Sequence, residues 1–387
     1  MTKLRIGVIY GGRSGEHEVS LASAAAVIAN LDPQRYDVVP LRIERTGRWV
    51  LAESAPVVAV AGEVIAAARA RTDRTLDASR STILLAEPSD QTLMTVARTA
   101  AEATPSDAPS MARISGLRLD VVFPVLHGPY GEDGTVQGLL ELADVPYVGA
   151  GVLASAVGMD KAVQKLVFAA RGLPIVAHEV VRRRAWHSDP AAVEADLLAR
   201  LPMPLFVKPA NLGSSVGISK VADASELSAA LALAAEHDRK IVIEAGVANA
   251  REIECAVLGN DEPQASVPGE IIPSREFYDY EAKYVETGTQ TVIPAALDAP
   301  QVARVQRLAL DAYGAIDCAG MARVDFLLGR DDGALYVNEV NTIPGFTTIS
   351  MFAKLWEASG LPYARLLDRL IDLAVERHAD RAPSSRA

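Results

Sequence analysis

The sequence predicts an α/β protein that begins with a doubly wound parallel sheet and continues into a mixed α/β and α+β part. Its 387 residues are too many for one small core and indicate two or three domains. Half of the residues are hydrophobic and 22% are charged, which is typical of a folded globular chain. Short apolar runs alternate with helical segments near the N-terminus, the order that a doubly wound sheet requires.

The first domain is expected over residues 1–150. Its predicted strands are 4–12, 36–43 and 119–128, and a helix at 17–31 follows the first of them. Residues 97–115 are rich in Ala, Pro and Ser with little apolar period, so we interpret 50–115 as an inserted surface excursion.

Two further domains are expected over residues 151–244 and 245–387. An apolar stripe at positions 163, 166, 167 and 170 predicts a helix, which Asp160 caps at its start and Gly172 ends. The remaining predicted elements are strands at 204–210 and 240–246, a helix at 225–236 between them, and a final helix at 363–378.

Two apolar stretches near the C-terminus, 321–328 and 334–345, carry Asp325 and Glu339 where a strand normally places core residues. The sequence GRDDG between them predicts a hairpin turn. If Asp325 lies opposite Glu339, the pairing centre falls at position 332, inside that turn. Strand alternation then groups these side chains on one side of the hairpin: Arg323, Asp325, Leu327, Val337, Glu339 and Asn341.

One face of this acidic hairpin would therefore carry two carboxylates, an amide and an arginine. Oxygen ligands of this kind suit hard cations, which often bind together with the phosphates of a nucleotide. The alternative is the solvated face of an edge hairpin, and the residues of the hairpin alone leave that alternative open.

Two glycine-rich segments of the first domain are candidate sites because each follows a predicted strand. In GGRSGEHEVS (11–20), Glu16 favours an ammonium group, and the spacing of a dinucleotide fingerprint is absent. VLHGPYGEDGTVQG (125–138) places His127 at the carboxyl end of a strand, where open α/β sheets bind ligands. The alternatives are an ordinary strand–helix turn and a structural histidine.

Three later segments point to a nucleotide. Lys208 lies on a strand before the loop 213–217, whose backbone N–H groups can fold over phosphates, although no P-loop spacing follows. Glu244, Glu252 and Glu254 are suited to accept hydrogen bonds from ribose hydroxyls or from the adenine amine. The polar, aromatic stretch 277–290 has the profile of a functional loop. A plain hairpin loop and a solvated strand face remain alternatives for the first two segments.

Composition argues against several other classes of protein. The net charge of −11 disfavours a general nucleic-acid binder, because phosphate contacts need a basic surface. Cys255 and Cys318 are too few for a disulfide framework and are interpreted as buried hydrophobic residues. The N-terminus lacks the apolar segment of a signal peptide, and no stretch approaches the ~20 apolar residues that span a bilayer. We expect a cytoplasmic protein without a membrane partner.

With these segments in order, the chain resembles the D-alanine–D-alanine ligases of the ATP-grasp superfamily. The motifs that carry the resemblance are EHEVS (16–20), HGPYGEDG (127–134), MDK (159–161), FVKPANLGSSVGISK (206–220), YDYEAKY (278–284), RVDF (323–326) and NEVNTIPGFTTIS (338–350). The resemblance runs from about residue 4 to about residue 374 and is weakest over 50–115. It implies a two-part ATP-grasp fold after the N-terminal sheet domain.

The resemblance implies that ATP lies between the central and C-terminal domains, with the phosphates on lysines and under the 213–217 loop. The implied ATP-binding residues are Lys161, Lys208, Ser214, Ser215, Val216, Glu244, Glu252 and Lys283. Two Mg²⁺ ions, or Mn²⁺ in their place, would bind to Asp325, Glu339 and Asn341.

The resemblance also implies the position of the first D-alanine. Glu16, tied by hydrogen bonds to Ser214 and Tyr284, would take its ammonium group, and His127 would lie beside it. The 213–217 and 277–290 loops would close to exclude water from an acyl phosphate.

The second D-alanine would bind through its carboxylate to Ser350 and to the backbone near Met351. Arg323 and the Gly345 N–H would face the oxyanion that forms when its amine attacks. The implied reaction makes D-alanyl-D-alanine, ADP and phosphate, for peptidoglycan precursor synthesis, in a homodimer.

Alternatives remain for the substrate and for the class of protein. Family members that make the D-alanyl–D-lactate ester typically lack a tyrosine here, so the resemblance implies that Tyr284 favours the dipeptide. D-Lactate and D-serine remain alternative acceptors. A nucleotide-binding regulatory protein without turnover is a second class, and a dehydrogenase using the N-terminal sheet is a third.

Overall fold

The computed structural model describes residues 2–52, 56, 80–98, 112–213, 216–273, 289–347 and 350–381. Contacts divide the chain into two compact units. Unit 1 comprises Met1–Val152, Gly345–Ala353 and Pro362–Ala387, and unit 2 comprises Leu153–Pro344 and Lys354–Leu361. The chain thus returns to unit 1 for its last helix, and a finer division into three domains stays a prediction.

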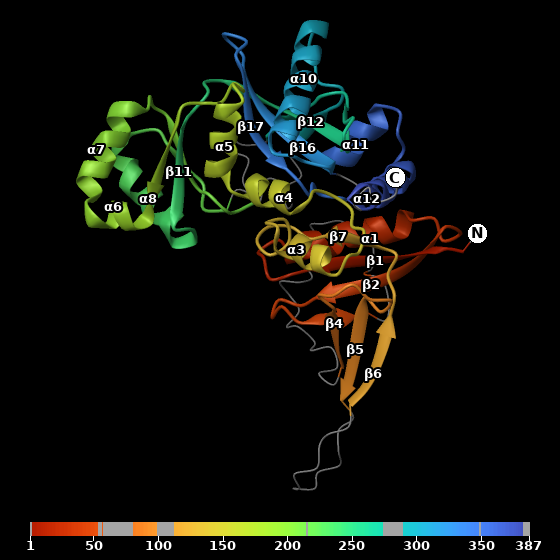
Figure 1. The fold of residues 1–387 in the computed structure, drawn as a ribbon. Coiled ribbons are helices and arrows are strands. Elements are labelled where there is room, and N and C mark those ends of the chain that lie inside the picture. Colours follow the sequence, from red (N-terminus) through yellow and green to blue (C-terminus); the bar gives the residue numbers. More distant parts are fainter. Residues whose placement is uncertain are drawn as a thin grey trace, which may run out of the picture. The chain divides into compact units, whose positions relative to one another are not determined.

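Unit 1 is built on a mainly parallel sheet with the strand order β3-β2-β1-β7 (Figure 1). Its strands are β1 (Leu4–Gly11), β2 (Tyr36–Ile43), β3 (Trp49–Leu51) and β7 (Val121–Val125). Strand β1 pairs in parallel with β2 and β7, as the alternating pattern predicts, and β3 adds an antiparallel edge. Gly11 and Gly12, at φ +93° and +99°, turn the chain from β1 towards helix α1 (His17–Asn30).

A second sheet in unit 1 lies within the 50–115 excursion, and the sequence interpretation did not predict it. Strands β4 (Arg80–Leu84), β5 (Leu93–Arg98) and β6 (Ala112–Leu117) form an antiparallel sheet in that order. Leu84 and Leu93 are buried in the same apolar cluster as Leu41 of the parallel sheet. Strands β4 and β5 therefore share the core of unit 1, which explains how such short strands are held.

The helices of unit 1 come from both ends of the chain. Helix α3 (Thr135–Leu142) follows β7, and α12 (Tyr363–Asp380) contacts α1 and β7. Tyr363 donates a hydrogen bond from its hydroxyl to the Phe346 carbonyl at 2.8 Å. The ring of Phe346 packs edge-on against Phe123 of β7, with centroids 5.6 Å apart, so the segment that starts at Gly345 is anchored in the core of this unit.

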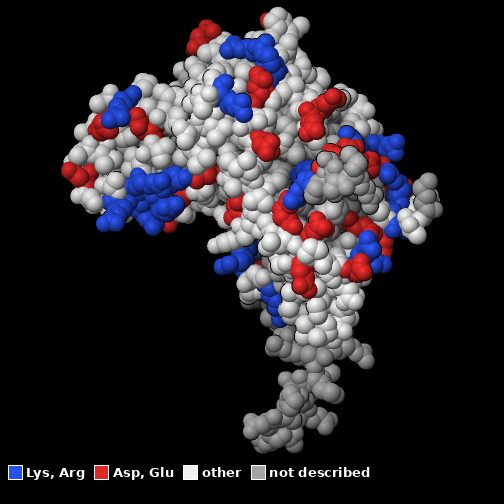
Figure 2. Space-filling view, viewed as in Figure 1, with Lys and Arg blue, Asp and Glu red and all other residues white. Residues whose placement is uncertain are grey.

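Unit 2 contains an antiparallel sheet of order β10-β9-β11-β8. Its strands are β8 (His178–Arg182), β9 (Leu205–Pro209), β10 (Ser219–Val221) and β11 (Lys240–Ala245). Val207, Ile241 and Ile243 pack with residues of α6 (Arg183–Ser188), α7 (Pro190–Arg200) and α8 (Leu227–His237). Because side chains alternate along a strand, Lys208 and Glu244 lie on the opposite face. Figure 2 shows a group of basic side chains where Figure 1 draws α6 and α8.

The second sheet of unit 2 has the order β15-β14-β12-β16-β17, with β13 pairing to β12. Its strands are β12 (Ala250–Gly259), β13 (Gln264–Ala265), β14 (Gly269–Ile272), β15 (Gln290–Val292), β16 (Gly320–Gly329) and β17 (Leu335–Asn341). Helix α10 (Ala299–Ala315) packs on β12, β16 and β17. Two short helices, α4 (Val152–Met159) and α11 (Met351–Ala358), each contain a point where the chain passes between the units.

The acidic hairpin forms with the predicted register. Asp325 of β16 pairs with Glu339 of β17, and Arg323 pairs with Asn341. One part of the face assignment is wrong: a bulge between Asp325 and the next residue makes Val337 pair with Phe326. Both of these apolar side chains are buried on the other face, because the extra residue of the bulge resets the alternation.

Helix α5 (Lys161–Ala170) also forms as predicted, but it buries a different face from the apolar stripe. The Asp160 side chain accepts hydrogen bonds from the N–H groups of residues 162 and 163 at 3.2 and 3.1 Å, as a cap should. Gln164 and Lys165 are 0% and 1% exposed, whereas Leu166 is 68% exposed. Across the described ranges, no helix is long and apolar enough to cross a membrane.

Candidate functional site

A buried ion triad occupies the face of the β9–β11 sheet opposite to the one that α6, α7 and α8 cover. Lys208 Nζ lies 2.5 Å from Glu244 Oε2, and Lys165 Nζ lies 2.8 Å from Oε1 of the same carboxylate. The side chains of Lys165 and Glu244 are 2% and 4% exposed, and that of Lys208 is 12% exposed. Two cations therefore share one anion away from bulk water, where charge interactions are strong.

The pKa values of the triad follow from this charge arrangement. Burial alone would raise the pKa of the Glu244 carboxyl, but the charges of Lys165 and Lys208 outweigh burial and lower it to about 2. Burial opposes the charge of Lys208, but Glu244 raises the pKa of its ammonium group, with smaller contributions from Glu339 and Glu252. The last two residues belong to the second sheet, so charged groups from both sheets of unit 2 act on Lys208.

The second sheet places a row of charged groups in register. Glu254 of β12 lies opposite Asp325, and Arg323 donates hydrogen bonds to both oxygens of Asp325 at 2.7 Å. Arg323 Nε also lies 3.2 Å from Glu254 Oε2. Burial disfavours the guanidinium charge, yet Asp325 and Glu254 hold the pKa of Arg323 well above its ordinary value. Arg323 therefore carries a fixed positive charge.

Asp325, Glu339 and Asn341 lie together at the end of the acidic hairpin. Asn341 Nδ2 donates a hydrogen bond to Asp325 Oδ2 at 2.9 Å, and Asp325 and Glu339 are direct cross-strand partners. Two carboxylates and one amide oxygen are hard ligands of the type that Mg²⁺ takes, so the residues present fit such an ion. Within the part of the chain that the structure describes, no group of three or more His, Cys, Asp or Glu side chains forms a metal site.

Helix α5 joins the two sheets of unit 2. Lys161 Nζ donates to the Leu212 carbonyl at 2.7 Å and lies 3.5 Å from Glu339 Oε2. The Gln164 amide exchanges two hydrogen bonds with the backbone of Val340, each of 3.2 Å. The helix thus contacts the segment after β9 through Lys161 and the triad through Lys165. Through Gln164 it contacts β17 at the residue between Glu339 and Asn341.

Unit 1 holds a separate group of candidate residues at the ends of β1 and β7. Glu16 and His127 are 9% and 6% exposed. The Ser14 hydroxyl donates to the His127 carbonyl at 2.6 Å, and the Ser23 hydroxyl lies 3.4 Å from His127 Nε2. Gly128 has φ +72°, and a Cβ added there would lie 2.8 Å from Glu16 Oε2. The two predicted residues are therefore close neighbours, separated by a glycine.

Residues 345–351 also belong to unit 1. Ser350 Oγ accepts a hydrogen bond from the Thr347 N–H at 3.0 Å, and a Cβ on Gly345 would lie 2.9 Å from this oxygen. Met351 is buried at the start of α11. The Phe346 N–H donates to Ser23 Oγ at 3.3 Å, so this segment and His127 share one serine as a neighbour.

Several predicted residues lie outside the described residues: Ser214, Ser215, Lys283 and Tyr284, with most of the 277–290 loop. Val216 is described and is 38% exposed. Other residues at these sites were absent from the predicted set: Gln164, Lys165 and Ser23. The spacing of Lys161 and Lys165, one helical turn apart, was the available signal for the second lysine.

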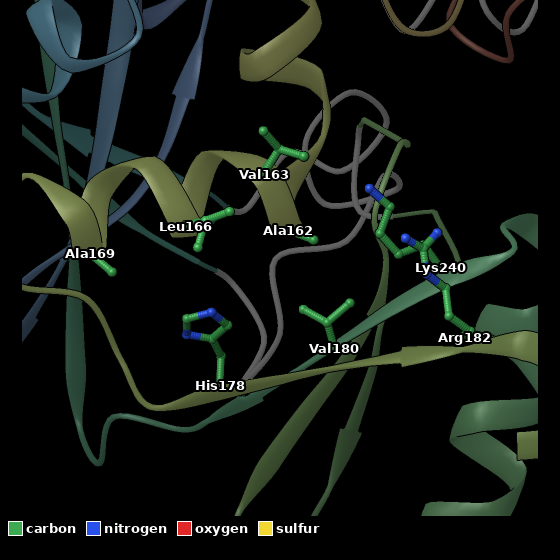
Figure 3. Close-up of a pocket in the computed structure, with 8 residues that line it drawn as sticks. All are labelled: Ala162, Val163, Leu166, Ala169, His178, Val180, Arg182 and Lys240. Atoms are coloured by element: carbon green, nitrogen blue, oxygen red, sulfur yellow. The ribbon is translucent and has the colours of Figure 1, made fainter. Parts of the chain in front are cut away.

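A groove of about 330 Å³ lies on the other side of α5. Figure 3 shows Ala162, Leu166 and Ala169 of the helix above His178 of β8, with Arg182 and Lys240 at one end; Val163 and Val180 complete the lining. The lining is mostly apolar and contains none of the site residues predicted from the sequence. This groove is therefore distinct from the buried triad.

Comparison with known proteins gives matches over nearly the whole of this chain. A family model described as the D-ala D-ala ligase N-terminus matches residues 5–150, and one described as the D-ala D-ala ligase C-terminus matches residues 167–372. A D-alanine–D-alanine ligase of Solibacter usitatus is 48% identical over 379 residues, covering 98% of each chain.

Solved structures agree with these matches. The D-alanine-D-alanine ligase from Coxiella burnetii aligns with a TM-score of 0.78 at 36% identity, over 98% of this chain and 96% of the other. The VanG D-Ala:D-Ser ligase from Enterococcus faecalis aligns with a TM-score of 0.78 at 34% identity, over 96% of this chain and 100% of the other.

Proposed function

The chain belongs to the D-alanine–D-alanine ligase family, and from this premise we propose that it joins two D-alanine molecules in an ATP-dependent reaction that releases ADP and phosphate. The product, D-alanyl-D-alanine, serves peptidoglycan precursor synthesis. The observation that carries the proposal is the convergence in unit 2 of Lys161, Lys208 and Arg323 with the carboxylates of the acidic hairpin.

In the first step the carboxylate of one D-alanine attacks the γ-phosphate of ATP, which forms an acyl phosphate and releases ADP. Two anions repel each other, so the site must supply positive charge. Lys161 and Lys208 are proposed to hold the phosphates, and the 213–217 loop to cover them with Ser214, Ser215 and Val216. Lys283 adds a further charge from the 277–290 loop.

Asp325, Glu339 and Asn341 are proposed to hold two Mg²⁺ ions, which when bound supply charge neutralisation at the phosphates. The residues of the chain then orient the nucleotide. Glu244 and Glu252 are proposed to accept hydrogen bonds from adenine and ribose, and the low pKa of Glu244 keeps it an acceptor at neutral pH.

Unit 1 is proposed to bind D-alanine. The Glu16 carboxylate is suited to bind an ammonium group. His127 directly precedes Gly128, the glycine that lies against this carboxylate. Ser214 and Tyr284 are proposed to orient Glu16. Excluding water matters at this stage, because an acyl phosphate is prone to hydrolysis.

In the second step the amine of the other D-alanine attacks the carbonyl carbon of the acyl phosphate. The tetrahedral oxyanion that forms collapses to the dipeptide with release of phosphate as the amine loses a proton. Ser350 and the backbone near Met351 are proposed to bind the carboxylate of this D-alanine. Arg323 and the Gly345 N–H are proposed to stabilise the oxyanion, and losing one such donor costs a factor of roughly 10²–10³ in rate.

The test is ADP formation that depends on D-alanine, measured with ATP and Mg²⁺. D-Lactate and D-serine are offered in parallel, because a D-Ala:D-Ser ligase is among the similar structures. Preference for D-alanine as acceptor supports the proposal, whereas ATP binding without D-alanine-dependent ADP formation refutes it. The homodimer and the cytoplasmic location stay predictions, and light scattering tests the first.

A further inference from the structure

Lys165 is a buried cation that the proposed reaction leaves without a role. Lys165 is 1% exposed as a whole residue, and its Nζ lies 2.8 Å from Glu244 Oε1. Lysine is rarely this buried unless it is paired. The lysines proposed for the phosphates are Lys161, on the same helix, and Lys208, on the neighbouring strand.

The triad has one more positive charge than negative charge. Glu244 contacts both Lys165 and Lys208, so either lysine alone would neutralise it. Lys208 has the more exposed side chain of the two, at 12% against 2%. The triphosphate of ATP offers Lys208 a stronger anionic partner. If Lys208 turns to the phosphates, Lys165 is the cation that remains on Glu244.

The position of Lys165 does not depend on Lys208. Its neighbour Gln164 exchanges two hydrogen bonds of 3.2 Å with the backbone of Val340, and Asp160 caps the helix start. Helix α5 therefore presents Lys165 to Glu244 from a fixed support, whatever the partner of Lys208.

Building on the proposed function, we propose that Lys165 is a positioning residue that keeps Glu244 ionised and in place while Lys208 binds the phosphates of ATP. Glu244 then stays a pure acceptor for the amino group of adenine. A buried carboxylate that lost both cations would take up a proton instead, because an isolated charge in the interior is costly.

The test is the number of protons taken up when ATP binds to Lys165→Met. In this variant Glu244 loses its last cation as Lys208 moves, so we expect about one proton more than in the wild type. Protonation linked to binding makes the Kd for ATP rise with pH relative to the wild type, to a limit of about tenfold per pH unit. Isothermal titration calorimetry between pH 6 and 8, in two buffers of different ionisation enthalpy, measures both quantities.

Three further variants separate charge from packing. Lys165→Gln removes the charge but keeps a donor, so it should also take up the proton, and Lys165→Arg should behave as the wild type. Lys240→Met breaks the ion pair of Lys240 with Asp160 at the start of the same helix, so it controls for a displaced α5. It should show no extra proton, whatever its effect on affinity.

The outcomes are distinct for the two proposals. The role of Lys165 is supported if Lys165→Met and Lys165→Gln take up the extra proton and Lys165→Arg and Lys240→Met do not. A wild type that binds ATP, together with Met and Gln variants that take up no extra proton, overturns the inference while the proposed function stands. A wild type that binds no ATP overturns the proposed function and the inference with it.

Discussion

Substituting alanine for Gly128 should weaken D-alanine binding by displacing Glu16. The added Cβ would lie 2.8 Å from Glu16 Oε2, so the carboxylate must retreat by about 0.6 Å to reach ordinary van der Waals contact. A charge-assisted hydrogen bond contributes roughly 1.5–3 kcal/mol. Losing about half of that interaction, roughly 0.75–1.5 kcal/mol, raises the KM for D-alanine about 3- to 12-fold, since 1.4 kcal/mol is one factor of ten.

The same substitution also has a backbone cost that must be separated from the effect on Glu16. Gly128 has φ +72°, where an L-residue costs roughly 1–2 kcal/mol. Gly172 has φ +71°, and a Cβ there would meet nothing within 4 Å. Gly172→Ala is therefore a matched control that carries the backbone cost without a contact to Glu16.

The assay measures the initial rate of ADP formation against D-alanine concentration at saturating ATP, with thermal unfolding recorded for both variants. Both should lower the Tm by a few degrees, on the order of 2–4 °C per kcal/mol for a domain of this size. Only Gly128→Ala should raise the KM for D-alanine. Equal KM values in the two variants would show that Glu16 does not bind the substrate.

Three other changes have clear expected results. Glu339→Gln should lower the rate of ADP formation by a factor of roughly 10²–10³, because charge at the phosphates is lost. The far-UV circular dichroism should stay unchanged, because a partly exposed side chain is replaced by one of similar shape. Near-normal turnover would refute the assignment of Glu339 as a metal ligand. Tyr284→Phe should raise phosphate release with D-lactate relative to D-alanine, and an unchanged ratio would mean that other residues choose the acceptor. The pKa of Glu244 is lowered from 4.5 to about 2, so its contribution to stability is complete above pH 4.5 and is lost as the pH falls towards 2. The Tm of the wild type should therefore fall more steeply across this range than that of Glu244→Gln, and parallel curves would contradict the strength of the ion triad.

The acidic hairpin could be predicted from the sequence because local signals agree with each other. Pairing Asp325 with Glu339 puts the centre of the hairpin inside the turn residues that follow β16, and the structure has this pairing. The bulge that turned Val337 to the other face was not predictable in this way. It inserts one residue into β17 without a glycine or proline to mark it.

The buried face of α5 could not be predicted from its apolar stripe. The stripe pointed to Leu166, yet the helix buries Gln164 and Lys165. Their partners, Glu244 and the backbone of Val340, lie 79 and 176 residues away in sequence, so the compensation for burying polar groups is invisible locally. The period of apolar residues therefore does not predict the buried face of a helix when polar side chains on that face are paired with residues distant in sequence.

The return of the chain to unit 1 has a consequence for how the protein is made on the ribosome. Tyr36 of β2 donates a hydrogen bond to Asp368 of α12 at 2.7 Å, and Arg377 of α12 donates to the Tyr147 carbonyl at 3.0 Å. At 5–20 residues per second, β1 leaves the ribosome roughly 20–70 s before α12 does. Unit 2 is almost complete at residue 344, before the last parts of unit 1 are synthesised. The part that starts first is therefore finished last, and a nascent chain released before residue 362 would leave the surfaces of α1 and β7 that contact α12 uncovered.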